Sequence, residues 1–152
     1  MEMDADYTVS ALRASDVARA YAIVRHLFPN IDLAEWQAAT STEDLRRNWL
    51  TVIDPAGVVR GISLVFVSPQ SGLSKQLEVP VLASVSLLNE HSVAGRLLEY
   101  AKRRAAEEGC NRIHVWPVAK TDHWLLGDTS TFKVPRAGLT YDLSPSKQPS
   151  PR

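Results

Sequence analysis

The sequence is poor in cysteine, in net charge and in long apolar runs. Its single cysteine, Cys110, excludes an internal disulfide and a cysteine-based zinc cluster, and it suits a reducing compartment. At the end of a helical pattern, a lone cysteine is more often a small buried residue than a catalytic thiol. The 17 basic and 17 acidic residues balance, so no net field steers a polyanion. We therefore expect no nucleic-acid partner and no membrane partner.

Other features that the sequence lacks bear on where the protein is located and on whether it binds a metal. No apolar run reaches the ~18 residues of a membrane span, and the opening MEMDADY is acidic, unlike a signal peptide. These features predict a cytoplasmic protein. The four histidines are scattered without i, i+4 pairs, so we expect no metal site. The 152 residues fit one domain over residues 1–143, and the polar stretch 144–152 predicts a disordered tail.

The most regular pattern in the chain runs from Gln76 to Pro117. Residues 76–88 form a near-continuous apolar segment, which predicts a strand buried on both faces. A polar break with two candidate helix caps, Asn89 and Ser92, precedes an amphipathic helix that ends at Gly109. Residues 112–116 predict the next strand. Strand, helix and strand at this spacing predict two parallel strands in one sheet.

The remaining patterns predict flanking elements. Residues 7–12 and 140–143 alternate like outer strands, and residues 132–134 like a further strand. Helices are predicted after Ser15, after the cap Asp32, after Ser41 or Thr42, and over 122–126, with a loop at 127–131. Residues 49–53 and 58–68 predict a hairpin around a Pro- and Gly-containing turn. Pro80 cannot donate to a sheet, so it predicts a bulge or a gap in pairing.

This order of elements resembles the GNAT N-acyltransferase superfamily over nearly the whole chain. The segments that carry the likeness are Val59–Gly61, which resembles the family's hairpin "V-x-G", the helix run Leu97–Ala101, the aromatic Phe132 and the closing Tyr141–Leu143. The resemblance implies an α/β fold with a mixed, mostly antiparallel sheet. It also implies a central splayed parallel pair of strands and flanking helices.

The resemblance further implies a loop that binds the pyrophosphate of acetyl-CoA or another acyl-CoA, with no metal. The family signature Q/R-x-x-G-x-G/A falls on Asn89, Ser92 and Ala94, of which only Ala94 matches. Small residues there let backbone N–H groups approach a phosphate. The alternative is a well-capped turn without a ligand. The implied cofactor-binding residues are Ser86, Leu87, Leu88, Asn89, His91, Ser92, Val93, Ala94, Gly95 and Arg96.

Catalytic groups are implied less directly. Glu78 is the one carboxylate on the long strand, and the resemblance makes it the general base; the alternative is an exposed charge at a strand entrance. The family's acid tyrosine has no counterpart between Val118 and Leu139. Asp32, Glu35 and His123 are implied contacts for the acceptor amine, although a surface-loop role is the commoner one for His123. His114 is more often a satisfied strand histidine than a base.

Three functions remain open from the sequence. The first is transfer of an acetyl or other acyl group from acyl-CoA to the primary amine of a small molecule or peptide, by a monomer or homodimer. The second is a degenerate member that senses CoA or binds a protein partner. The third is an unrelated α/β binding domain with the same order of elements.

Overall fold

The computed structural model describes residues 7–72, 74–84, 90–117, 123–127 and 129–143. Its strands form one sheet in the order β1-β2-β3-β4-β5-β6. Their bounds are β1 (Thr8–Ala11), β2 (Trp49–Ile53), β3 (Val59–Pro69), β4 (Lys75–Ser84), β5 (Arg112–Val115) and β6 (Leu139–Asp142). In this part of the chain β4 and β5 pair in parallel, and every other neighbouring pair is antiparallel. The predicted mixed sheet with a central parallel pair is confirmed.

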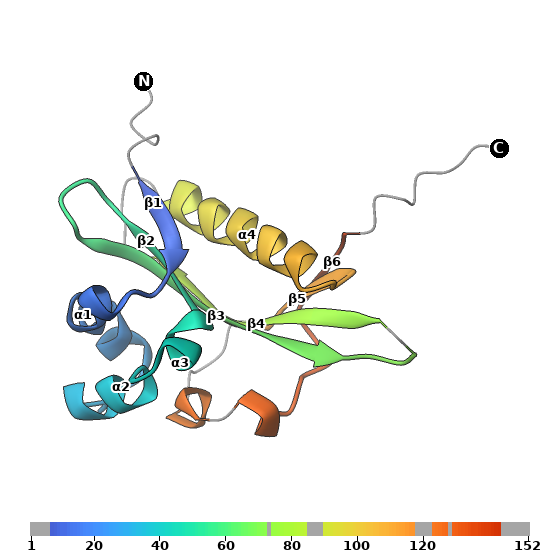
Figure 1. Ribbon diagram of the computed structural model, residues 1–152, viewed down its shortest axis with the longest axis horizontal. Coiled ribbons are helices and arrows are strands. Elements are labelled where there is room, and N and C mark those ends of the chain that lie inside the picture. Colours follow the sequence, from blue (N-terminus) through green and yellow to red (C-terminus); the bar gives the residue numbers. More distant parts are fainter. Residues whose placement is uncertain (1–6, 73, 85–89, 118–122, 128, 144–152) are drawn as a thin grey trace.

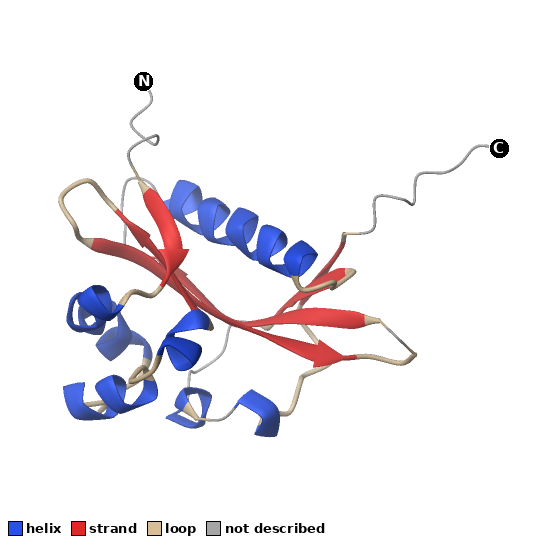
Figure 2. Cartoon of the chain, viewed as in Figure 1, coloured by secondary structure: helices blue, strands red, loops and turns tan. Residues whose placement is uncertain are grey.

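Helices cover both faces of the twisted sheet (Figures 1 and 2). On one face lie α1 (Val17–Leu27), α2 (Leu33–Ala39) and the short 3-10 helices η3 (His123–Leu126) and η4 (Thr129–Thr131). The long helix α4 (Glu90–Glu107) crosses the other face. A short helix, α3 (Glu43–Arg47), leads into β2. Within the described ranges, the helices lack the length and apolar character needed to cross a membrane.

Local signals account for the helix ends. Asp32 accepts a hydrogen bond from the Glu35 backbone, and Glu35 accepts one from the Asp32 backbone, so α2 begins with a complete capping box. Gly109 has φ of +80°, the left-handed conformation predicted for the residue after α4. The prediction of Ser92 as a helix cap is wrong, because α4 begins at Glu90 and contains it. The other candidate, Asn89, lies outside the described residues.

Each face of the sheet has its own core. On the first face the Trp36 ring packs edge-on against Trp49 at 5.1 Å, and its indole N–H donates to the Val17 carbonyl. On the second face Val93 and Leu97 of α4 are fully buried. A Cβ placed on Gly61 would lie 2.5 Å from Cγ1 of Val93, so glycine there lets α4 approach β3 closely.

The end of the chain departs from two predictions. Residues 132–134 are not a strand, because Phe132 turns its ring into an aromatic cluster and Pro135 lacks a backbone donor. The predicted loop at 127–131 contains η4. The short helix expected at 122–126 is present as η3. Cys110 is a free thiol, 7% exposed, whose pKa is raised by burial, in keeping with a structural role.

Candidate functional site

The central feature of the site is the point where β4 and β5 part. Their ladder runs from Gln76 beside Arg112 to Val79 beside Val115, and the Trp116 N–H then donates to the Val79 carbonyl at 3.0 Å. Beyond that bond β4 continues to Ser84 and pairs with β3 alone among the described strands. We call the β5-facing edge of residues 80–84, which pairs with no described strand, the wedge. A strand edge without a neighbouring strand is a surface to which an extended ligand can add as a strand.

A bulge lies at the start of the wedge. Leu64 of β3 pairs with Val81, but Phe66 pairs with Glu78, so Val79 and Pro80 together face a single β3 residue. Proline supplies no donor to a ladder, which explains why regular pairing breaks here. The bulge predicted from Pro80 is confirmed.

Glu78 precedes the bulge on β4 and lies at the centre of a buried hydrogen-bond network. Its Oε2 accepts from Ser68 Oγ at 2.8 Å and from Gln76 Nε2 at 2.7 Å. Its Oε1 accepts from Trp116 Nε1 at 2.9 Å and lies 2.7 Å from His114 Nδ1. The carboxyl group is 0% exposed and His114 is 3% exposed. The alternative of an exposed charge at a strand entrance is therefore wrong.

The positions of the protons follow from the partners of His114. Its Nε2 lies 2.6 Å from the Ala137 carbonyl oxygen, which only accepts, so Nε2 carries hydrogen. One proton then lies between Nδ1 and Glu78. Three further N–H and O–H donors, from Ser68, Gln76 and Trp116, bond to the same carboxyl group. The pair as a whole carries no net charge, which is what makes full burial tolerable.

Backbone and aromatic packing hold the network in place. Gly138 follows Ala137 with φ of +115°, and a Cβ there would collide with the Val115 carbonyl and lie 3.0 Å from His114 Nε2. Only glycine lets this segment approach β5 so closely. On the same face the rings of Phe66, Trp116 and Phe132 form an edge-on cluster, with Phe66 and Phe132 5.3 Å apart. His114 is thus the satisfied strand histidine that was expected.

Comparison with solved structures identifies this architecture. Glucosamine-6-phosphate N-acetyltransferase from Arabidopsis thaliana superposes with a TM-score of 0.62 at 9% identity, covering 74% of this chain and 83% of that one. An acetyltransferase of Trypanosoma brucei gives 0.59 at 16% identity, covering 91% and 100%. The NatC complex bound to Gag peptide and CoA gives 0.56 at 14% identity, covering 72% and 75%. The chain has the GNAT fold. No family model matches the sequence, and a search of curated proteins finds no relative.

Within this GNAT fold the predicted cofactor-binding residues separate into groups. Ser92, Gly95 and Arg96 line one cavity of about 420 Å³ on α4, together with Val9, Glu99 and Arg103. Val93 is fully buried in the core, so only its backbone is available to a ligand, and Ala94 is half-buried. His91 lies in the first turn of α4. The predictions for Ser86, Leu87, Leu88 and Asn89 lie outside the described residues.

The predicted acceptor residues lie apart from the Glu78 network. Asp32 and Glu35 cap α2, and their reciprocal bonds are solvent-exposed. His123 begins η3 on the same face of the sheet. Neither Asp32 nor Glu35 hydrogen-bonds to Glu78. In the part of the chain that the structure describes, no three His, Cys, Asp or Glu residues are grouped to hold a metal ion.

Sequence reasoning missed four members of the network, namely Ser68, Gln76, Trp116 and the Ala137 carbonyl. The sequence did contain a pattern that indicates part of the network. Gln76 and Glu78 are two residues apart and therefore share one face of a strand, and the same holds for His114 and Trp116. Those faces meet only in one register of the parallel pair, and the sequence does not state that register.

Proposed function

We propose that this protein is an N-acyltransferase that moves an acetyl group from acetyl-CoA to a primary amine by direct attack. The observation that carries the proposal is the wedge. An open β4 edge offers backbone N–H and C=O groups to the extended, amide-containing arm of CoA, as a missing strand would. The GNAT fold supports the same class of reaction, as do the names of three neighbours, of which two are acetyltransferases and one is a complex bound to CoA.

The cavity on α4 supplies a place for the phosphates. Arg96 lines it half-buried and stacks over the Tyr7 ring at 5.4 Å, and Arg103 lies on the same side of the helix. Two guanidinium groups suit phosphate oxygens, which they contact with paired N–H donors. Gly95 is exposed there and adds no side chain between the helix and a ligand. We assign phosphate binding to this cavity and to the predicted residues Ser86, Leu87, Leu88, Asn89 and His91.

The chemistry requires few protein groups. The unprotonated amine attacks the thioester carbonyl, the C–S bond breaks, the CoA sulfur takes a proton, and the nitrogen gives one up. Backbone N–H groups in the wedge orient the carbonyl and stabilise charge on its oxygen. Glu78 is our candidate for receiving the amine proton. All four of its lone-pair sites are already occupied, so it accepts that proton only when one of its hydrogen bonds opens.

Acceptor recognition is assigned to the face that carries α2 and η3. Asp32 and Glu35 each use one carboxylate oxygen for the capping box, which leaves the other oxygen for a cationic amine. His123 is assigned to the same region. The acceptor is an amine of a small molecule or a peptide, and the active species is a monomer or a homodimer.

Binding of acetyl-CoA is the first test. At about 100 times its dissociation constant, a ligand that binds only the folded state adds about 2.7 kcal/mol to the unfolding free energy. ATP at equal concentration serves as the control for nucleotide binding alone. Arg96→Gln, which keeps the helix but removes the half-buried charge, should reduce the acetyl-CoA shift. An absent shift, or an equal one with ATP, would contradict the proposal.

A second function is favoured by the enclosure of Glu78. A carboxylate whose lone pairs all accept hydrogen bonds can stabilise the fold, but it has no unoccupied site to receive the proton of the amine. The alternative is a CoA-binding module without catalysis, which acts as a sensor or binds a protein partner. To separate the two, kcat should be compared in Glu78→Gln and His114→Gln at a temperature where both are folded. A base at Glu78 predicts a much larger loss in Glu78→Gln; equal losses would leave Glu78 a structural role.

A further inference from the structure

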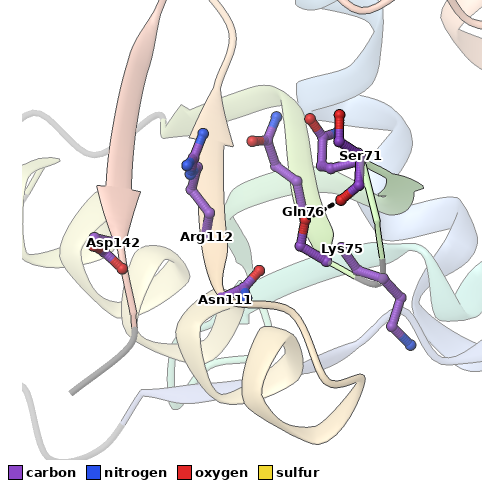
Figure 3. A pocket seen from close by; sticks show the side chains of 8 residues that line it. Ser71, Lys75, Gln76, Asn111, Arg112 and Asp142 are labelled. Carbon is purple, nitrogen blue, oxygen red and sulfur yellow. Dashed lines mark hydrogen bonds between the residues drawn. The ribbon is translucent and has the colours of Figure 1, made fainter. Parts of the chain in front are cut away.

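A second polar cavity lies at the opposite end of the β4–β5 pair from the wedge. Its volume is about 410 Å³, and all the residues that line it are polar: Gln70, Ser71, Ser74, Lys75, Gln76, Asn111, Arg112 and Asp142 (Figure 3). Gln76 and Pro80 are four residues apart on β4, which places the cavity roughly 13 Å from the start of the wedge at about 3.3 Å per residue. This distance makes the cavity separate from the site proposed for acyl transfer.

Strand pairing sets which side chains share the cavity. Ser68 pairs with Gln76, Gln76 with Arg112, and Arg112 with Asp142, so this row points to one face of the sheet. Figure 3 shows Gln76 and Arg112 projecting side by side, whereas the Lys75 side chain extends away from them. Arg112 is therefore the cation of this cavity and Asp142 its carboxylate.

Two polar groups there lack partners among the described residues. The exposed Arg112 guanidinium forms neither an ion pair nor a hydrogen bond with a described side chain. Gln76 is only 7% exposed, and its amide N–H₂ is used by Glu78, yet no described donor reaches its amide oxygen. A guanidinium and an amide oxygen that line the same cavity are thus available to the carboxylate and ammonium groups of a ligand.

The cavity wall is also connected to the Glu78 network. Gln76 Nε2 donates directly to Glu78 at 2.7 Å. Gln70 Nε2 donates to Ser68 Oγ at 3.1 Å, and Ser68 Oγ donates to Glu78 at 2.8 Å. A ligand that moves either amide thereby changes the hydrogen bonding of Glu78, which also holds the indole N–H of Trp116 at the wedge.

We propose that this cavity binds a small zwitterion of the free amino-acid type, and that its occupancy is transmitted to Glu78 through Gln76. Guanidinium groups pair with carboxylates through two parallel hydrogen bonds, which suits Arg112. The neighbouring Asp142 disfavours dianions such as phosphate and attracts an ammonium group, which the Gln76 amide oxygen also accepts. Serine hydroxyls and amides on the loop complete a polar lining for a small side chain.

The test is titration of the isotopically labelled full chain with each of the twenty common amino acids, followed by amide and indole N–H resonances. We expect at least one amino acid to produce saturable shifts at Gln76, Asn111 and Arg112. The amide and the N-acetyl derivative of that amino acid each remove one charge and should bind at least 10-fold more weakly. Arg112→Gln should also weaken binding at least 10-fold, whereas Arg25→Gln, which removes an exposed cation on α1, should leave it unchanged.

Transmission has its own readout. The Trp116 indole N–H should shift on binding in the native chain, and this shift should disappear in Gln76→Leu while that variant keeps a cooperative unfolding transition. Absence of saturable binding by every amino acid overturns the site. If Arg112→Gln binds the amino acid as tightly as the native chain does, the ligand does not bind at Arg112. If the Trp116 indole N–H resonance does not shift on binding, the proposed coupling to Glu78 is wrong. Acetyl-CoA binding is measured independently, so failure here leaves the acyltransferase proposal standing.

Discussion

Replacing Glu78 with glutamine measures how much the buried network stabilises the fold. The substitution keeps the size of the side chain, removes its charge and exchanges one acceptor oxygen for a donor. His114 Nδ1, now 2.7 Å from Oε1, loses its carboxylate partner in a site where both residues are at most 3% exposed. One lost charge-assisted hydrogen bond costs about 1.5–3 kcal/mol, and removing one partner of a buried ion pair costs about 3–5 kcal/mol.

We therefore expect Glu78→Gln to lower the unfolding free energy by about 3 kcal/mol, because Gln76 and Ser68 reorient to relieve part of the mismatch. In a domain of this size each kcal/mol lowers the melting temperature by about 2–4 °C, so the expected shift is roughly 6–12 °C. Urea unfolding followed by tryptophan fluorescence gives the free energy, and calorimetry gives the temperature.

A double-mutant cycle with His114→Gln decides whether the pair is the cause. Coupled residues give interaction energies of about 0.5–3 kcal/mol, and we expect a value above 1 kcal/mol here. Glu99→Gln is the matched control, because Glu99 forms its ion pair with Lys102 at 70% exposure and should change stability by less than about 0.5 kcal/mol. Additive single effects, or a loss below about 1 kcal/mol in Glu78→Gln, would refute the reasoning.

Three further predictions concern the rest of the fold. Gly61→Val should cost about 1–3 kcal/mol in urea unfolding, because its Cβ would lie 2.5 Å from Val93 Cγ1. Gly138→Ala should cost at least about 2 kcal/mol and shift the His114 ring resonances, since φ is +115° there and the Cβ meets the Val115 carbonyl; an unchanged spectrum would contradict the packing. At Asp54 burial would raise the pKa, but hydrogen bonds from Val58, Arg60 and Ala56 outweigh it and lower the pKa from 3.8. A carboxyl group whose pKa is lowered on folding stabilises the fold at pH values above its pKa in the unfolded chain. The native chain should therefore exceed Asp54→Asn in unfolding free energy by a constant amount near neutral pH and by less below about pH 4. A difference in unfolding free energy that does not change with pH would contradict this.

Local chemistry in the sequence determined most of the elements. The helix cap Asp32, the left-handed Gly109 and the bulge at Pro80 each depend on one residue type and its near neighbours, and each is present as predicted. The apolar periodicity of residues 93–105 likewise marked the face of α4 that is buried. Predictions that depended on a few weakly patterned residues were less secure, as the absent strand at 132–134 shows.

The tertiary structure alone decided what surrounds Glu78. Its environment depends on the register between β4 and β5, which brings His114 beside it, and on the close approach of Ala137 and Gly138. These contacts join residues far apart in the chain, so no local pattern specifies them. The sequence indicated that a carboxylate lies on the central strand. Only the assembled sheet determined that it is fully buried, bound by four side chains, and placed between the wedge and a second polar cavity.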